Sequence, residues 1–218
     1  MNQELTDITV LLDRSGSMSS CATDVIGGFN SFLRDQRAGA GWARLTLIQF
    51  DSTNDQEIVY LAKPVAEAPN LTPETFKPRG STPLYDAMGK AIVATGERLA
   101  AMPEAQRPSK VVFLVMTDGY ENHSREYTHF MIRDMVKVQT EKYSWAFIFI
   151  GADIDAMAQG GMVGLNRGST LTINKASTVD AFNLTSAKLR SYRVSADVSD
   201  LNYSQAERDT LNKADQKS

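Results

Sequence analysis

Short apolar runs alternate with helical patterns along most of the chain. Runs of about four to eight residues that are apolar throughout are typical of strands buried on both faces of a sheet. Ile8–Leu12, Val111–Met116 and Trp145–Ile150 are predicted strands of this kind, and two further strands are predicted at Arg44–Phe50, which partly alternates, and at Ser169–Ile173. Glu57–Ala62 is predicted to pair with Arg44–Phe50 as a hairpin whose turn is Asp51–Gln56. Pro64 places this hairpin strand at an edge, because proline cannot donate to a central ladder.

Apolar residues three and four positions apart predict the helices between these strands. The first helix carries its apolar stripe on Val25, Ile26, Phe29, Phe32 and Leu33. Gly27 and Gly28 lie inside it and predict close packing against the sheet. The next helix begins at Pro83, and Thr82 before it has the chemistry of an N-cap. Further helices are predicted at 125–142, within 151–164 and at 178–193.

Strands that alternate with helices indicate βαβ units and therefore a mostly parallel sheet. The predicted fold class is α/β: a doubly wound central sheet with one antiparallel edge strand and helices on both faces. Residues 1–194 are expected to form one domain. From Ser195 the sequence is polar, so residues 195–218 are expected to be a C-terminal extension that is either mobile or weakly helical.

The composition narrows the range of functions. The 218 residues include 23 basic and 26 acidic side chains, a net charge of −3, which argues against a nucleic-acid partner because phosphate contact needs clustered Lys and Arg. The apolar runs are far shorter than the ~20 residues that cross a bilayer, and the acidic N-terminus lacks a signal-peptide core. One cysteine, Cys21, indicates a reducing compartment. A cytoplasmic protein without membrane contact is therefore predicted.

Polar oxygen ligands stand where the predicted strands meet the helices. Asp13, Ser15 and Ser17 follow the first strand, Thr82 precedes the Pro83 helix, and Asp118 follows the strand Val111–Met116. In open α/β sheets, ligands bind beyond the carboxyl ends of the strands, so these side chains are expected to converge. Hydroxyl and carboxylate oxygens without imidazole or thiolate favour Mg²⁺ or Mn²⁺ over zinc.

This order of motifs resembles that of von Willebrand factor A domains. The resemblance covers roughly residues 5–193 by order of elements, and it rests on Asp13-x-Ser15-x-Ser17, Thr82 and Asp118. It implies that these five residues form a metal-ion-dependent adhesion site, with the serines binding the ion and the aspartates acting mainly through its waters. It further implies that a carboxylate of an Asp or Glu on a partner protein completes the coordination. The segment 149–153 and Asp155-Ala156 resemble stand-alone prokaryotic and phage members.

Each of these motifs also has a plain structural explanation, as a helix cap or a turn. Serine, threonine and aspartate beside a helix are common caps, and Asp118-Gly119 is a common turn. Nucleotide-binding and serine-hydrolase motifs (G-x-G-x-x-G, G-x-x-x-x-G-K-[ST], G-x-S-x-G) are absent. The first hypothesis is a non-enzymatic, metal-dependent protein-binding module. The alternative is a Mg²⁺-dependent hydrolase or phosphatase with a metal-bound water, which lacks a clear general base. A third is a scaffold whose binding surface lies elsewhere, such as the C-terminal region.

The remaining candidates are assigned to structure or to the rim of the site. Cys21 is expected to be inert, and His123 and His129, six residues apart, to face solvent rather than to share a metal. Asp153 and Asp155 are expected to be helix caps. Six loop residues are expected to surround the site: Arg14, Arg79, Tyr120, Glu121, Asn122 and Arg125.

Overall fold

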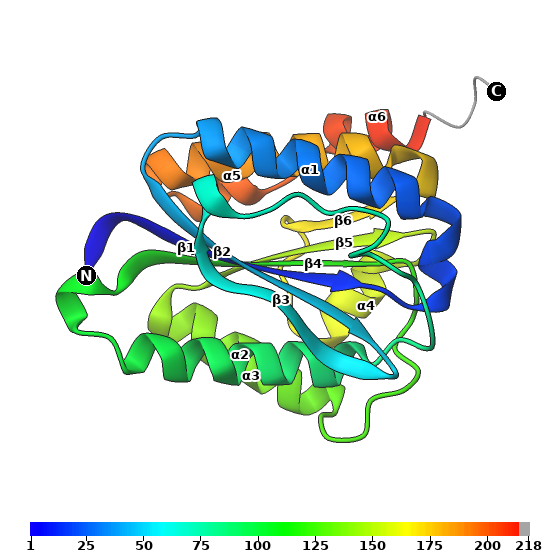
Figure 1. The fold of residues 1–218 in the computed structure, drawn as a ribbon, viewed down its shortest axis with the longest axis horizontal. Coiled ribbons are helices and arrows are strands. Elements are labelled where there is room, and N and C mark those ends of the chain that lie inside the picture. Colours follow the sequence, from blue (N-terminus) through cyan, green and yellow to red (C-terminus); the bar gives the residue numbers. More distant parts are fainter. Residues whose placement is uncertain (214–218) are drawn as a thin grey trace.

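A six-stranded sheet forms the centre of the computed structural model, which describes residues 1–213 (Figure 1). The strands are, in chain order, β1 (Asn2–Asp13), β2 (Trp42–Asp51), β3 (Asn54–Pro64), β4 (Pro108–Thr117), β5 (Ala146–Ala152) and β6 (Thr170–Ile173). They lie in the order β3-β2-β1-β4-β5-β6, and every neighbouring pair is parallel except β2 with β3. The predicted fold class, with one antiparallel edge strand, is confirmed.

Helices cover both faces of the sheet (Figure 1). On one face lie α1 (Ala22–Ala38), α5 (Thr178–Ser195) and α6 (Gln205–Lys213), and on the other lie α2 (Leu84–Ala100), α3 (His129–Tyr143) and α4 (Ala156–Met162). Short 3₁₀ helices occur at Gly16–Cys21, Val65–Glu67, Glu104–Gln106, Lys175–Ser177 and Val198–Leu201. Within residues 1–213, no helix has both the length and the apolar character needed to cross a bilayer.

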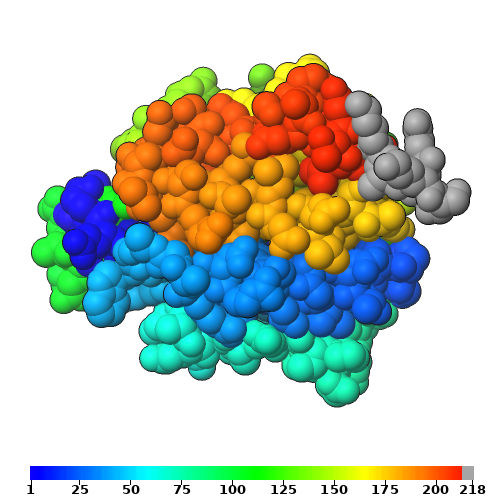
Figure 2. Space-filling view, turned by 90° about the horizontal axis from the view of Figure 1, so that it is seen from above, coloured from blue at the N-terminus to red at the C-terminus, as the bar shows by residue number. Residues whose placement is uncertain are grey.

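The hydrophobic core has two parts, one on each face of the sheet. In β1, Ile8, Val10 and Leu12 face the α1 and α5 side, whereas Leu11 faces α2, as the alternation of side chains along a strand requires. Figure 2 shows α1 and α5 side by side over the first of these faces.

The glycines of α1 pack differently from the prediction. A Cβ on Gly28 would lie 2.6 Å from Cδ2 of Phe182, whereas nothing lies within 4 Å of a Cβ on Gly27. The expected packing of Gly27 and Gly28 against the sheet is therefore wrong. Gly28 instead allows the close approach of α5, because a side chain there would displace the Phe182 ring.

The turn between β2 and β3 is shorter than predicted. Only Ser52 and Thr53 separate the two strands. Oδ1 of Asp51 accepts hydrogen bonds from the backbone N–H groups of Thr53 at 2.6 Å and Asn54 at 3.1 Å. These hydrogen bonds let the chain reverse direction within two residues. Residues 54–56, predicted to be in the turn, therefore belong to β3.

Helix α3 begins at His129, four residues after the predicted Arg125. The Asp86 carboxylate accepts the backbone N–H groups of residues 125, 126 and 127 at 2.8–3.0 Å. These groups are thereby held outside the helix, and the Thr128 side chain caps it by accepting from Met131 N–H.

The chain beyond α5 packs back onto the domain. Leu201, Tyr203 and Leu211 are buried in the same core as α1 and α5, although apolar residues are sparse in this part of the sequence. The hydroxyl groups of Tyr203 and Thr185 lie 2.7 Å apart. The described part of the predicted extension is thus mainly helical, and residues 214–218 lie outside the described residues.

Candidate metal centre

Two adjacent strands bring their carboxyl ends together at the candidate site. Leu12 of β1 pairs with Met116 of β4, so Asp13 and Thr117 end the two strands at the same level. The Thr117 hydroxyl donates to Oδ2 of Asp13 at 2.5 Å, and the backbone N–H of Ser15 donates to Oδ1 at 2.7 Å. Both oxygens of this fully buried carboxylate are therefore held in place.

The serine hydroxyls lie between Asp13 and Asp118. Oγ of Ser15 and Oγ of Ser17 are 3.1 Å apart, and Ser17 Oγ donates to Oδ1 of Asp118 at 2.5 Å. Ser15 is buried, whereas Ser17 is exposed, so this group of oxygens extends from the interior to the surface. The Gly16 N–H between them donates to the carbonyl of Gly80 at 3.0 Å. This bond fixes the loop that carries the two serines (residues 14–17, the serine loop) to the loop before α2.

Thr82 belongs to the same group and does not cap a helix. Pro83 occupies the N-cap position of α2, so the N-cap role expected for Thr82 is wrong. Asn122 holds the Thr82 backbone on both sides: its Oδ1 accepts from Thr82 N–H at 2.9 Å, and its N–H donates to the Thr82 carbonyl at 3.2 Å. A Cβ on Gly119 would lie 2.8 Å from Thr82 Oγ1 and 3.8 Å from Ser17 Oγ, so these two hydroxyls flank the space above Gly119.

All five residues predicted for the site therefore lie together. Burial raises the pKa of Asp13 to about 6, and the nearby charge of Asp118 adds to this shift, although hydrogen bonds from Thr117 and Ser15 oppose it. An ionised Asp13 beside Asp118 is costly in this buried position. A cation at the hydroxyls would offset that cost.

Lys175 is a member of the site that the sequence analysis missed. Its Nζ lies 2.7 Å from Oδ2 of Asp118. Burial alone would lower the pKa of Lys175, but the ion pair with Asp118 outweighs burial and raises it, so the side chain is an ammonium. Lys175 directly follows β6 and Asn174, at the same sheet edge as Asp13 and Asp118. The rule that strand ends converge could have identified it.

Thr117 and Asn122 were also underestimated by sequence reasoning. Thr117 holds the carboxylate of Asp13, and Asn122, which is predicted to be a rim residue, holds the backbone of Thr82. Their position next to Asp118 in the chain was the available signal.

Arg14 does not surround the site as expected. It is 3% exposed and lies on the β2 side, where its guanidinium donates to Asp51, Gln49 and Glu57 at 2.6–3.1 Å. Arg79 contributes a further bond to Asp51 at 3.0 Å. This network links the serine loop, the β2–β3 hairpin and the loop before α2. Arg14 therefore stabilises the loop that carries the site serines and does not line the site itself.

The other predicted rim residues have different surroundings. Tyr120 and Arg125 are exposed at the surface. Glu121 is half-buried and joins its loop to the start of α2, because it accepts from the N–H groups of Tyr85 at 2.9 Å and Ser124 at 2.7 Å.

Of the residues assigned to structure, Cys21 and Asp155 behave as expected, whereas Asp153 and the two histidines do not. Cys21 is buried, and burial raises its pKa to about 11, which leaves the thiol protonated and unreactive. Asp155 caps α4, as predicted, whereas Asp153 accepts from the backbone N–H of Lys175 at 3.2 Å instead of capping a helix. His123 and His129 are both half-buried rather than solvent-facing.

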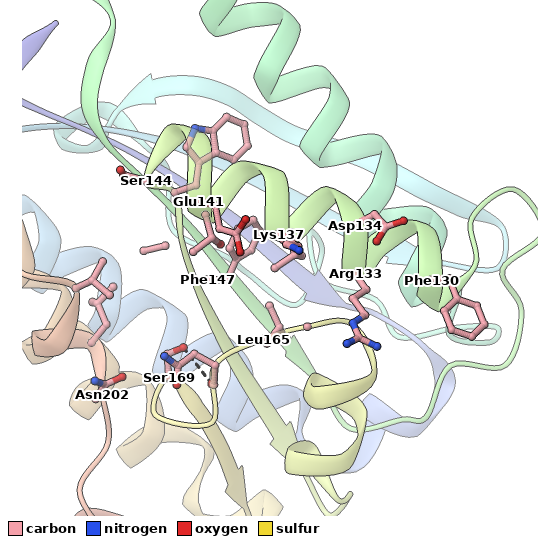
Figure 3. A pocket seen from close by; sticks show the side chains of 18 residues that line it. Phe130, Arg133, Asp134, Lys137, Glu141, Ser144, Phe147, Leu165, Ser169 and Asn202 are labelled. Atoms are coloured by element: carbon pink, nitrogen blue, oxygen red, sulfur yellow. Dashed lines mark hydrogen bonds between the residues drawn. The ribbon is translucent and has the colours of Figure 1, made fainter.

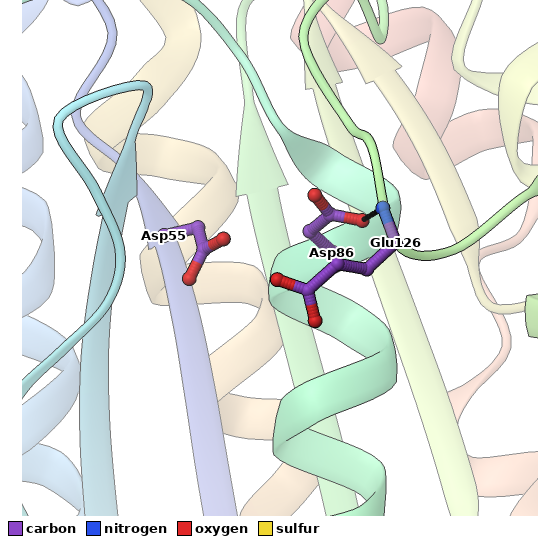
Figure 4. Close-up of side chains that lie close together, drawn as sticks. All are labelled: Asp55, Asp86 and Glu126. Atoms are coloured by element: carbon purple, nitrogen blue, oxygen red, sulfur yellow. Dashed lines mark hydrogen bonds between the residues drawn. The ribbon is translucent and has the colours of Figure 1, made fainter.

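Two other features are separate from this centre. A cavity of about 800 Å³ lies between α3, the start of β5 and the turn at Leu201 (Figure 3). Asp55, Asp86 and Glu126 gather beside α2 (Figure 4), but the ammonium of Lys90 lies 2.9 Å from Asp55 and 2.7 Å from Glu126. Lys90 therefore pairs with two of these carboxylates, and the third, Asp86, accepts three backbone N–H groups.

The donor set at the candidate centre fits a hard divalent cation. Three hydroxyl oxygens lie inside a frame of two carboxylates, and Gly119 leaves open the space that a side chain would fill. Oxygen ligands of this kind suit Mg²⁺ or Mn²⁺. Ser15, Ser17 and Thr82 would hold the ion, with Asp13 and Asp118 behind them.

Comparisons with known proteins define the class of fold. No protein-family model and no curated protein matches the sequence. Among solved structures, the chain is similar to proximal thread matrix protein 1 of the mussel byssus with a zinc-occupied MIDAS motif, with a TM-score of 0.58 and 13% identity over 84% of this chain and 47% of that one. A von Willebrand factor type A structure from Catenulispora acidiphila gives 0.57 and 12%, over 84% and 42% of the two chains.

Manganese-loaded TRAP protein of Plasmodium vivax gives a TM-score of 0.52 and 15% identity, over 83% of this chain and 72% of that one. This chain spans about half or less of the mussel and Catenulispora chains. At these identities the likeness concerns the fold alone. The chain has the fold of a von Willebrand factor type A domain.

Proposed function

We propose that this chain is a metal-dependent protein-binding module. In this proposal, Mg²⁺ or Mn²⁺ is held by Ser15, Ser17 and Thr82, with Asp13 and Asp118 as supporting carboxylates. A carboxylate of an Asp or Glu on a partner protein then completes the coordination of the ion. The observation that carries the proposal is that three hydroxyls and two carboxylates lie together: Asp13 accepts from the Ser15 N–H, the Ser15 and Ser17 hydroxyls are 3.1 Å apart, Ser17 donates to Asp118, and the Thr82 and Ser17 hydroxyls both lie within 4 Å of a Cβ placed on Gly119.

The charge balance of the donor set favours an acidic partner. Hydroxyl ligands do not neutralise a divalent ion, so the ion would supply a strong positive charge at the surface beside the exposed Ser17. Nucleic acid and lipid headgroups would require basic clusters around the site, whereas the charged groups that contact one another there are the carboxylate of Asp118 and the single amine of Lys175. A protein carboxylate is therefore the proposed ligand.

Binding is favoured over hydrolysis because the carboxylates are already engaged. Asp13 accepts from Thr117 and Ser15, and Asp118 contacts Ser17 and Lys175. A general base needs a free carboxylate or imidazole within reach of the attacking water. These contacts leave neither aspartate free for that role.

The biological setting extends this proposal. We place the protein in the cytoplasm, since its one cysteine is a buried free thiol. The relation to stand-alone prokaryotic and phage domains rests on residues 149–153 and 155–156 alone.

The direct test is calorimetric titration of the purified, metal-stripped chain with Mn²⁺ and Mg²⁺. We expect one binding event per chain that Ser15→Ala and Asp13→Ala abolish. Ser19→Ala is the matched control, because Ser19 lies on the surface of the same 3₁₀ helix as Ser17 but is not one of the three hydroxyl residues proposed to hold the ion. Absence of binding, or equal binding in all variants, refutes the metal centre.

The second stage tests the partner. Affinity capture from the native host, with and without EDTA, should retain a protein that Ser15→Ala loses and Ser19→Ala keeps. Replacing single acidic residues of that protein by their amides should then remove the interaction at one position. Capture that neither EDTA nor Ser15→Ala affects refutes metal-dependent binding.

A further inference from the structure

The ammonium of Lys175 reaches the candidate metal centre from the end of β6, at the same sheet edge as Asp13 and Asp118. Its backbone N–H is held by Oδ1 of Asp153 at 3.2 Å. Its Nζ lies 2.7 Å from Oδ2 of Asp118, and it also donates to Ser20 Oγ at 3.1 Å and to the Ser17 carbonyl at 3.4 Å. The amine therefore bridges the loop after β1 and the loop after β4.

The two oxygens of Asp118 have different partners. Oδ1 accepts the Ser17 hydroxyl, whereas Oδ2 is buried, accepts no hydrogen bond from the described residues and has the Lys175 amine as its ion-pair partner. The carboxylate is fully enclosed while the lysine is 25% exposed, so the lysine is the partner that can move to water. A divalent ion at Ser15 and Ser17 would meet a carboxylate whose charge is already balanced, with a positive charge close beside it.

We propose that Lys175 is an internal counter-ion of Asp118 that competes with the divalent cation and weakens metal binding to the free domain. This inference rests on the proposed function, because it assumes that the ion binds at the hydroxyls of Ser15, Ser17 and Thr82. Two cations that share one carboxylate repel each other most strongly where water is excluded. Uptake of the metal therefore requires Lys175 to release Asp118 and turn towards solvent.

The first test compares Mn²⁺ affinities by calorimetry of the full-length chain. Lys175→Met removes the charge but keeps an unbranched apolar side chain, and we expect it to bind Mn²⁺ on the order of tenfold more tightly than the natural chain. Lys175→Arg keeps the charge and should bind as weakly as the natural chain. Lys188→Met is the matched control, because Lys188 also pairs with a carboxylate, Glu207 at 2.9 Å, but lies on α5.

Each outcome bears on a different statement. Equal or weaker binding in Lys175→Met, or an equal gain in Lys188→Met, overturns the competition. If the natural chain, the control and Lys175→Met all fail to bind Mn²⁺, the metal centre itself is refuted, and the competition with it.

A second measurement uses the natural chain and does not depend on the folding of any variant. Acetylation by acetic anhydride, followed residue by residue with mass spectrometry, reports how accessible each amine is. Mn²⁺ at saturation should increase the labelling rate of Lys175 severalfold and leave that of Lys188 unchanged. Unchanged labelling of Lys175 in the metal-saturated chain overturns its release from Asp118.

Discussion

The Thr117 hydroxyl lies 2.5 Å from Oδ2 of Asp13, so a side chain at the end of β4 ties down the carboxylate at the end of β1. The same hydroxyl oxygen accepts from the Gly119 N–H at 3.0 Å. Thr117 thus connects Asp13, which anchors the serine loop, with Gly119, above which the hydroxyls of Ser17 and Thr82 lie. This contact therefore helps to fix the shape of the centre.

Thr117→Val is expected to destabilise the domain. Valine keeps the volume of threonine but leaves an oxygen of the buried Asp13 carboxylate without its donor, which costs about 1–3 kcal/mol. Urea unfolding in metal-free buffer measures this loss of free energy. Thr117→Ser retains the hydroxyl and should lose less. Equal stability of Thr117→Val and the natural chain would show that the contact contributes nothing.

Asp51→Asn is expected to change the response of the domain to acid. Burial alone would raise the pKa of Asp51, but hydrogen bonds from Thr53 and Arg14 outweigh it and hold the pKa below its usual range. A carboxyl with a lowered folded-state pKa stabilises the domain above its unfolded pKa, and this contribution is lost as pH falls through the folded value, below about pH 4.

At neutral pH, Asp51→Asn leaves the buried Arg14 short of a partner and should cost on the order of 3 kcal/mol. The variant should also lose less stability than the natural chain between about pH 4 and pH 2. Urea unfolding at a series of pH values measures both effects. The exposed Asp134 provides a control, since Asp134→Asn should leave the pH profile as it is. Parallel profiles for Asp51→Asn and the natural chain would contradict the role of Asp51.

The sheet and the five oxygen-bearing residues could be predicted because each depends on local pattern and chain order. Val111–Met116 is apolar throughout and Ile8–Leu12 is so except for Thr9, because neighbours cover both faces, and Asp13 and Asp118 follow at the ends of these strands. Parallel strands then bring those ends to one edge of the sheet.

Features that depend on pairing between distant residues could not be predicted. Arg14 resembles a solvated loop residue in the sequence, and only the position of Asp51 on β2 makes it a buried ion pair. Lys175 follows β6, so the convergence of strand ends could place it at the same sheet edge as Asp118, but the 2.7 Å contact of its amine with that carboxylate depends on the strand order, which the sequence pattern does not give. The start of α3 was likewise misjudged, because Asp86 on α2 takes the backbone N–H groups that a first helical turn would leave free.

Two glycines of α2 should respond in opposite ways to alanine. A Cβ on Gly89 would lie 2.4 Å from the ring of Tyr127, whereas nothing lies within 4 Å of a Cβ on Gly96. Gly96→Ala should therefore stabilise the domain by about 1 kcal/mol through helix propensity. Gly89→Ala should destabilise it by about 1–3 kcal/mol, because Tyr127 has to move. Thermal and urea unfolding of both variants measure the difference, and equal effects would contradict the packing of Tyr127 on α2.

Gly119→Ala is expected to remove metal binding while leaving the fold intact. The added methyl would lie 2.8 Å from Thr82 Oγ1 and 3.8 Å from Ser17 Oγ, in the space between the hydroxyls. Gly119 does not have a positive φ, so alanine does not strain the backbone there. Mn²⁺ affinity measured by calorimetry should fall on the order of tenfold or more, because the ligands have to separate to admit both methyl and ion.

The control for this substitution is Gly161→Ala, which introduces a methyl where nothing lies within 4 Å and should bind Mn²⁺ like the natural chain. Circular dichroism and urea unfolding without metal establish that both variants fold. Thr82→Ala separates the two ways in which Gly119→Ala could act: if Thr82 is a ligand, Thr82→Ala also weakens binding, and combining it with Gly119→Ala adds little. Natural affinity in the folded Gly119→Ala chain would place the ion away from the space between Thr82 and Ser17, and would contradict the proposed centre.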